Sequence, residues 1–315
     1  MKSYPRTVAA VLAEPWAILP EKLEAIAELI QLKADGVMLS DEQIEARLAG
    51  SKVASVARRA GDVAVLPVTG VISQRMNLLT EFSGGTSTEK LAANLRSALA
   101  DDSIKAIVLD VDSPGGAVSG VEELAAEIQG ARGGKPIIAS INSLAASAAY
   151  WIASAADEVT ITPGGQAGSI GVYTMHVDQS VALETAGVRP TLVSAGKFKT
   201  EGNPFGPLSE EARNAMQARV DEYYGLFVDA VARGRGVRSS DVRSGFGEGR
   251  TVGAKEAVAQ GMADRIETLQ QTLARLGVRG GLGVRGPARA EETQPAPRAT
   301  AFGRLRRQIE LDDEM

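Results

Sequence analysis

Residues Pro136 to Ser154 carry a serine in a setting that suits nucleophilic catalysis. An apolar, β-rich run leads within a few residues into an alanine-rich stretch, which predicts a helix with Ser147 near its start. A hydroxyl there lies close to free backbone N–H groups and to the positive end of the helix dipole, and both favour a developing oxyanion. Alanine and serine suit a close helix-packing surface equally well, so composition alone leaves a structural role open.

A second segment that could do chemistry is Asp112-Ser113-Pro114-Gly115-Gly116, directly after the apolar run Ile104–Val111. Paired glycines at the end of a strand let the backbone turn sharply and present bare N–H groups. In an open α/β sheet this edge is where ligands bind. The segment therefore predicts either an oxyanion donor and peptide-holding strip, or an ordinary tight turn between a strand and a helix.

A serine nucleophile needs a general base, and the chain offers few candidates. Lys197 and Lys199 lie in the loop Gly196–Pro204, and the single histidine is His176. A loop lysine is usually a solvated charge, but burial lowers the pKa of an ammonium by up to about 3–5 units and makes it a base. A Ser-His-Asp triad with His176 stays open as the alternative, because triads are recognised by geometry.

Composition and motif order argue against several other kinds of site. The chain has no cysteine and one histidine, which removes disulfides, thiol catalysis and His-rich metal centres. The glycine-rich stretch Gln166–Val172 leads into a predicted strand, whereas a dinucleotide fingerprint leads into a helix. A net charge of −5 without a long basic block argues against a dedicated nucleic-acid binder. We therefore expect no metal ion, cofactor or nucleic-acid partner.

The elements that must position these residues alternate along the chain. With 315 residues, 44% of them hydrophobic, the chain can bury a full core. The predicted strands are Val63–Leu66, Ile104–Val111, Ile137–Ile141, Val159–Ile161 and Ile170–Tyr173, and helices are expected to start near Thr88, Ser119, Ala145 and Ser209. Ser119 with Glu122 forms a predicted capping box. This alternation predicts βαβ units with mostly parallel strands.

Two short helices are predicted ahead of this α/β unit. Pro20 opens the first, whose apolar face carries Leu23, Ile26, Ala27 and Ile30. Ser40 and Gln43 form a capping box for the second, which ends at Gly50. The apolar patch Val8–Ala13 is too short for a signal peptide, and the apolar stretch Ala145–Ala156 is too short to cross a membrane. We therefore expect a cytoplasmic protein without a membrane partner.

The chain is expected to divide into a helical N-terminal segment (1–58), a main domain (59–272) and a flexible tail (273–315). The tail repeats Gly-Val-Arg-Gly and is rich in proline. Its end, Arg304–Glu314, switches from basic to acidic, which suggests either a partner-binding helix or a solvated terminus. The predicted helix Glu210–Arg233 is either a contact surface between copies or a core-facing helix. Its apolar residues are Met216, Val220, Phe227 and Val231.

Taken in order, these segments resemble the signal peptide peptidase A (protease IV) family of serine–lysine peptidases, in particular its phage branch of head maturation proteases. The resemblance covers about two-thirds of the chain. The matching motifs are Val63-Ala-Val-Leu-Pro-Val-Thr-Gly-Val-Ile, Asp112-Ser-Pro-Gly-Gly, Ala145-Ala-Ser147-Ala-Ala-Tyr-Trp-Ile-Ala, Gly168-Ser-Ile-Gly-Val, Lys197-Phe-Lys199, the helix end Phe227–Arg235, and Val252-Gly-Ala-Lys-Glu-Ala-Val-Ala-Gln-Gly-Met-Ala-Asp264.

This resemblance implies a ClpP/crotonase-like α/β fold, with a parallel sheet and flanking helices, and a Ser/Lys dyad. Ser147 matches the family's nucleophile, Lys199 its general base, and Ser169 the serine that hydrogen-bonds that lysine. Lys197 is the competing base, but the phase of the match favours Lys199.

The resemblance also implies an oxyanion hole made by the backbone N–H of Gly115 or Gly116 together with that of Ala148. Many members have two glycines after the nucleophile, where this chain has Ala148 and Ala149. Alanine still donates its N–H, while the added methyl groups narrow the site.

The function implied is a serine endopeptidase that matures phage capsids by cutting scaffold, portal or coat protein in the prohead, inside the host cytoplasm. Ring-like homo-oligomers are implied as well. Two alternatives stay open: a cytoplasmic signal-peptide or peptide-degrading peptidase of the same family, and a catalytically inactive capsid assembly or scaffold protein. A crotonase-type acyl-CoA enzyme is disfavoured, because we find no convincing catalytic acid.

Overall fold

The computed structural model describes residues 13–34, 37, 57–75 and 85–278. Within them a ten-stranded sheet has the central order β10-β7-β6-β5-β3-β2, with β4 beside β3, β1 beside β5, and β8 and β9 beyond β6. The strands are β1 (Trp16–Ile18), β2 (Arg58–Ala60), β3 (Val63–Ser73), β4 (Thr86–Ser87), β5 (Ala106–Ala117), β6 (Ile137–Ala146), β7 (Glu158–Ile161), β8 (Gln166–Gly168), β9 (Thr251–Gly253) and β10 (Arg265–Ile266). Neighbours pair in parallel except at β1–β5, β2–β3 and β8–β9.

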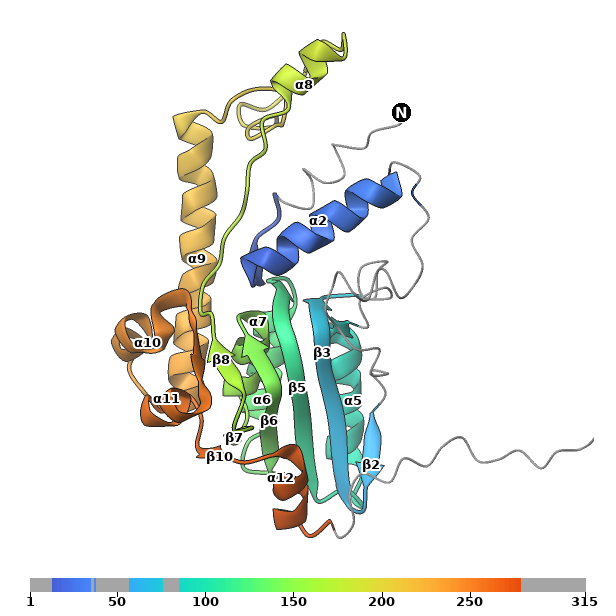
Figure 1. Cartoon of the computed structure of the whole chain (residues 1–315), viewed down its shortest axis with the longest axis vertical. Helices are drawn as coiled ribbons and strands as arrows, with labels where there is room; N and C mark the ends of the chain where they lie inside the picture. Colours follow the sequence, from blue (N-terminus) through green and yellow to red (C-terminus); the bar gives the residue numbers. More distant parts are fainter. Residues whose placement is uncertain (1–12, 35–36, 38–56, 76–84, 279–315) are drawn as a thin grey trace, which may run out of the picture. The chain divides into compact units, whose positions relative to one another are not determined.

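The helices that connect and cover these strands are shown in Figure 1. They are α2 (Pro20–Ala34), α5 (Thr88–Ala100), α6 (Val121–Gly130), α7 (Ala148–Ser154), α8 (Ser180–Thr185), α9 (Glu210–Arg235), α10 (Ser239–Gly245), η1 (Gly247–Gly249), α11 (Ala254–Ala259) and α12 (Leu269–Arg275). Serine side chains cap two of them: Ser87 accepts from the Lys90 N–H (3.3 Å) and Ser209 from the Ala212 N–H (3.2 Å). Such caps satisfy N–H groups that the first turn leaves without partners.

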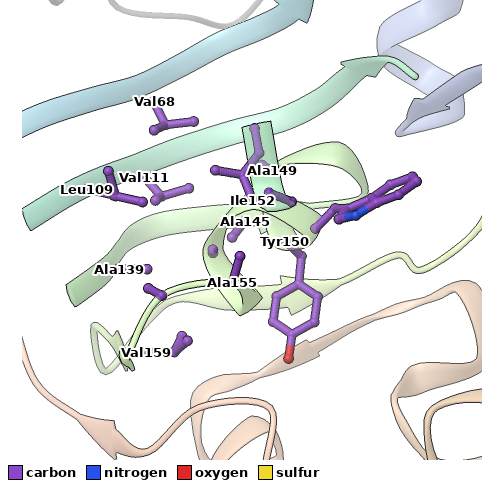
Figure 2. Packing of buried hydrophobic residues seen from close by; sticks show 14 of the residues in the cluster. Val68, Leu109, Val111, Ala139, Ala145, Ala149, Tyr150, Ile152, Ala155 and Val159 are labelled. Atoms are coloured by element: carbon purple, nitrogen blue, oxygen red, sulfur yellow. The ribbon is translucent and has the colours of Figure 1, made fainter. Parts of the chain in front are cut away.

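The main core lies where the strands meet helix α7. The central strands are apolar almost without interruption, as parallel strands covered on both faces must be, and β5 is buried throughout Ala106–Leu109. Every residue of α7 is buried. Figure 2 shows Ala149 and Ile152 of this helix beside Val68, Leu109 and Val111 of the sheet. The nucleophile predicted from the sequence therefore stands at the start of the most enclosed helix.

Helix α9 is anchored at its C-terminal end. The ring of Phe227 stacks on that of Trp151 in α7, with centroids 4.5 Å apart. Gly234 lies so close to the end of α7 that an added Cβ would be 2.1 Å from the Ser154 carbonyl oxygen. Arg235 forms an ion pair with Asp264 (2.7 Å). Of the predicted apolar residues of this helix, Phe227 and Val231 are core residues, while Met216 and Val220 stay half-exposed.

The predicted α/β class, parallel sheet and flanking helices are confirmed. The helix that begins at Pro20 is confirmed as well, with Leu23 and Ile26 buried. Two local predictions are wrong. Ile170–Tyr173 forms no regular strand, and only Tyr173 makes a bridge, to Trp16.

The second error is the capping box at Ser119 and Glu122. The N-cap of α6 is Gly120, in a left-handed conformation (φ 79°) without a side-chain cap. A Cβ at Gly120 would lie 2.5 Å from the Thr88 hydroxyl oxygen, so the close approach of α5 requires glycine there.

Several other predictions concern the ends of the chain. The expected boundary after residue 272 falls inside α12, where Leu273 is buried. The helix predicted between Ser40 and Gly50 and the segment Arg304–Glu314 lie outside the described residues. Among the described helices, none combines the length and apolar character needed to cross a bilayer.

Candidate active site

Ser147 links the end of β6 to the start of α7. Its backbone has φ 56° and ψ −120°, a conformation that costs energy for any residue with a Cβ and that proteins often keep at functional sites. Three hydrogen bonds fix it: its N–H donates to Gly168 O (2.7 Å), its carbonyl accepts from the Trp151 N–H (3.0 Å), and its hydroxyl donates to Gly171 O (3.4 Å). The side chain is presented at the N-terminal end of a buried helix, and Ser147 is only 1% exposed.

The glycine pair at the end of β5 lies beside this serine. Gly115 has φ 99°, and an added Cβ would lie 3.0 Å from the carbonyl oxygen of Ala146, the residue before the nucleophile. A Cβ at Gly116 would lie 1.9 Å from Ile72 O on β3. Neither position tolerates a side chain. The Gly115 N–H already donates to the Ser113 hydroxyl (3.1 Å), which itself donates to Gly70 O (2.6 Å).

Ser169 follows strand β8 and lies next to the nucleophile. Strand β8 pairs with β6 in the register Ala146↔Gly168, so Ser147 and Ser169 each continue from a paired position. Ser169 also has a left-handed backbone (φ 54°) and is 7% exposed, and its N–H donates to Arg250 O (2.8 Å). The structure thus gathers Ser147, Ala148, Ser169 and the glycine pair.

The predicted base is not joined to this group. Lys199 lies in an exposed loop, where its backbone N–H donates to the backbone carbonyl of Gly196 (3.2 Å). In the described part of the chain its ammonium has no hydrogen bond or ion pair. The competing Lys197 is also exposed, pairs with Glu211 (3.2 Å) and lies over the Phe198 ring (4.5 Å). The loop borders a hollow of about 260 Å³ against the start of α9.

His176 is likewise engaged away from the serine. Its Nε2 lies 3.0 Å from Asn203 O, in the same segment that carries the two lysines. No hydrogen bond between His176 and Ser147 occurs within residues 13–34, 57–75 and 85–278, so a triad is not assembled there.

Two carboxylates lie on β5 ahead of the glycine pair: Asp110, which the sequence analysis did not consider, and Asp112, which it named only as part of the glycine segment. Burial raises the pKa of Asp110, although Asn142 donates to it (3.3 Å). Burial also raises the pKa of Asp112, and the neighbouring charge of Asp110 adds to the effect. Their alternate spacing on one strand was the signal available in the sequence.

The described ranges hold no group of three His, Cys, Asp or Glu side chains arranged to bind a metal ion. What the site offers is a strained serine hydroxyl, backbone N–H groups and a second serine. This chemistry suits attack on a carbonyl and stabilisation of the oxyanion that results.

Comparison with known proteins gives the family of the region that carries this site. Residues 130–282, which include Ser147, Ser169 and Lys199, match the sequence profile of peptidase family S49. This part of the chain belongs to that family. The S49 region runs from the end of α6 to beyond α12 and so contains the nucleophile candidate and both lysines.

Relatives of the S49 region come from phages and from cells. The chain is 35% identical to the head-tail preconnector protein GP5 of Enterobacteria phage P21 over 75% of this chain and 46% of the phage protein. It is 35% identical to the capsid assembly protease C of Escherichia phage lambda over 65% of this chain and 46% of that protein. Protease 4 of Salmonella typhi is 30% identical over 68% of this chain and 34% of its own length. The predicted family is confirmed, and the chain spans about half the length of these phage relatives.

Proposed function

We propose that this chain is a serine endopeptidase in which Ser147 is the nucleophile and Lys199 the general base. The observation that carries the proposal is the strained serine at the start of buried α7, set against a glycine pair that no side chain can replace. Membership of residues 130–282 in a peptidase family supports it.

In the proposed reaction the neutral Lys199 amine takes the Ser147 proton while the oxygen attacks a peptide carbonyl carbon. The N–H of Ala148 and that of Gly116 or Gly115 hold the oxyanion. The C–N bond breaks as the lysine ammonium returns its proton to the leaving amine, and water then cleaves the acyl-enzyme by the same route. Ser169 holds the lysine amine in position.

For this reaction Lys199 must reach Ser147, and we propose that a neighbouring copy of the chain brings it there in a homo-oligomer. The segment from Met175 to Phe198 supports this idea, because it exposes a row of large apolar side chains. They are Met175, Val181, Val188, Leu192, Val193 and Phe198, and Val193 is 95% exposed. In an isolated copy this apolar surface is exposed to water, and contact with a partner would bury it.

The substrates we propose are scaffold, portal or coat proteins of a phage prohead, assembled in the host cytoplasm. Support comes from the relatives named as a capsid assembly protease and a head-tail preconnector protein. Similarity to Protease 4 keeps a peptide-degrading role as the second candidate. A catalytically inactive scaffold protein is the third, and the test below separates it from the first two.

The test is intact mass spectrometry of the wild-type chain and of Ser147→Ala and Lys199→Ala, alone and with a candidate scaffold protein. Lys197→Ala is the matched control, since it removes a charge from the same loop. We expect defined fragments with wild type and Lys197→Ala and whole chains with the other two. Whole chains in every sample, general protein substrates included, would favour the inactive scaffold protein. Cleavage that survives Lys199→Ala but not His176→Ala would assign the base to histidine.

A further inference from the structure

The N-terminal strand lies in a slot beside the nucleophile. Strand β1 pairs antiparallel with the end of β5 in the register Trp16↔Ala117, Ala17↔Gly116 and Ile18↔Gly115. On its other edge, Trp16 exchanges two hydrogen bonds with Tyr173 (2.8 and 3.0 Å). We call the space between residues 114–118 and Gly171–Tyr173 the β1 slot. A peptide substrate that adds as a strand to the glycine pair needs the same space.

The N-terminal strand also uses the backbone group that the proposed chemistry requires. Leu19 N–H donates to Pro114 O (3.0 Å), and Val118 N–H donates to Pro15 O (3.4 Å). Hydrogen-bonded pairs recur at every second residue of an antiparallel ladder, so Ala17 and Gly116 form the pair between these two. The Gly116 N–H thereby faces the Ala17 carbonyl. An added Cβ at Gly115 would lie 2.2 Å from that same oxygen.

The nucleophile is closed off while the slot is filled. Ser147 is 1% exposed, and its hydroxyl donates to Gly171 O, two residues before the Tyr173 bridge to Trp16. We propose that residues 15–19 are an internal pseudosubstrate, which keeps the protease latent until this segment leaves the β1 slot. The inference rests on the proposed function, since it takes Ser147 as the nucleophile.

The packing around β1 suits a removable cover. A small cluster holds the segment: Trp16, Ile18, Leu23 and Ile26 are buried against Val71 and Ala117 of the main domain, and half-buried Tyr173 and Val177 pack against them. Ala17 alone of the strand joins the main core. Tyr173 packs against this cluster, and its hydroxyl is a buried group without a hydrogen-bond partner in the described structure. Departure of β1 and α2 would let water reach that hydroxyl, which lowers the cost of release.

A chain that can be opened after folding tests the proposal. The full chain is made as Ser147→Ala, with the recognition site of an unrelated, site-specific protease inserted between residues 38 and 56. The chain is cut, the N-terminal piece is removed, and binding of a fluorescent peptide with the sequence of residues 13–19 is followed by anisotropy. We expect binding at least tenfold tighter after removal. The same peptide with proline in place of Ala17 is the control and should bind at least tenfold more weakly, because it lacks the N–H that faces Gly116 O.

Two outcomes would overturn the proposal. Equal peptide binding before and after removal would mean that residues 15–19 do not block the slot. Loss of the circular-dichroism signal on removal would mean that β1 is a required strand of the fold.

The cut chain with Ser147 intact separates this inference from the proposed function. Peptide binding that appears only after removal of the N-terminal piece, without cleavage of any peptide or protein, would support the pseudosubstrate role of residues 15–19. It would contradict the proposed peptidase function. Cleavage that begins only after the cut, or on Ala17→Pro in the uncut chain, would support both.

Discussion

The two halves of helix α9 face different surroundings although they belong to one continuous helix. The half from Phe227 to Gly234 is packed against α7, and six of its eight residues are buried. The part from Arg213 to Leu226 has no buried residue, and just before it an exposed ion pair between Lys197 and Glu211 joins the first turn of the helix to the loop that carries Lys199. Neighbouring residues of the helix thus divide between a fixed core and an open surface.

This contrast separates a residue that the chain positions by itself, Ser147, from one that another molecule would have to position, Lys199. The anchored half supports α7 and with it the backbone of Ser147, through the Trp151–Phe227 stack. The exposed half supports the proposed base, which has no partner in the described chain. A nucleophile that is fixed and a base that is delivered would make activity depend on assembly.

The comparison predicts that one methyl group has opposite effects in the two halves. Gly234→Ala places a Cβ 2.1 Å from the Ser154 carbonyl oxygen, and we expect a loss of about 4 kcal/mol or more in the free energy of unfolding. Gly225→Ala meets nothing within 4 Å, so it should gain about 0.5–1 kcal/mol from helix propensity. Urea unfolding followed by circular dichroism measures both. Equal effects would show that the two halves are not different.

Removal of the aromatic stack should lower the free energy of unfolding by a smaller but still large amount. Phe227→Ala leaves a cavity beside Trp151, and we expect it to lower the free energy of unfolding by about 3–4 kcal/mol. Met216→Ala, at a half-exposed position of the same helix, is the control and should cost less than about 1 kcal/mol. Chemical unfolding of both variants checks this. A costly Met216→Ala would mean that the exposed half is packed in solution, as in an oligomer.

Loss of Arg132 should have the next largest effect on stability, because its single guanidinium donates hydrogen bonds to carbonyls at the ends of two helices, α7 and α9. Its N–H groups donate to the carbonyls of Ser154 (3.2 Å), Ala155 (2.8 Å), Ala156 and Gly234 (2.9 Å). Arg132→Ala leaves these carbonyls without their donor, and we expect a loss of about 2–3 kcal/mol, measured as a fall in unfolding midpoint. Arg96→Ala is the matched control.

The control arginine forms a two-pronged ion pair with Glu127 (2.7 Å for each contact) at the surface. Exposed pairs add little to stability, so the midpoint of Arg96→Ala should hardly move. A similar fall in both variants would contradict a special role for Arg132.

The smallest expected effect is a pH dependence at the anchored end of α9. Burial opposes the ionisation of Asp264, but hydrogen bonds from Arg235 and from the Val159 N–H outweigh it and lower its pKa. A carboxyl with a lowered pKa stabilises the fold above its unfolded value of about 3.9, and this stability is lost as the pH falls through the folded value. For this partly exposed group we expect about 1 kcal/mol or less.

The measurement is the difference in unfolding free energy between wild type and Asp264→Asn from pH 6 to pH 3. The difference should shrink below pH 4 as Asp264 is protonated. Asp110 and Asp112 act in the opposite direction, since their raised pKa values favour the protonated folded state, and they cancel because both proteins retain them. Parallel curves for the two proteins would refute the prediction.

Much of the fold could be predicted from local patterns. Pro20 starts α2, Ser209 caps α9, and the alternation of apolar runs with helices gives the parallel sheet. These features depend on residues close in sequence, which a pattern can record. The cap at Gly120 was missed because the need for glycine comes from contact with Thr88, a distant residue.

The candidate site was predicted less completely for the same reason. The place of Ser147 between a strand and a helix follows from the change of pattern around it, and β6 and α7 meet there. The pairing of Trp16–Ile18 with the glycine pair joins residues about 100 positions apart, and no pattern in the neighbouring sequence predicts it. Lys199 as the base stays a prediction, because the ion pair of its loop is with Glu211 in the first turn of α9 and not with the serine.

The fully buried core side chains of α9 lie between Phe227 and Ala232, so this part of the helix can serve as the pivot of a lever. With a rise of 1.5 Å per residue, the distance from Phe227 to Glu210 is about 25 Å, so a tilt of about 5° at the pivot moves the far tip by about 2 Å. The pivot touches the last turn of α7 through Gly234 and Ser154. A rearrangement at this contact too small to disturb the core would therefore be amplified at the tip, over the distance that decides whether a proton can be transferred.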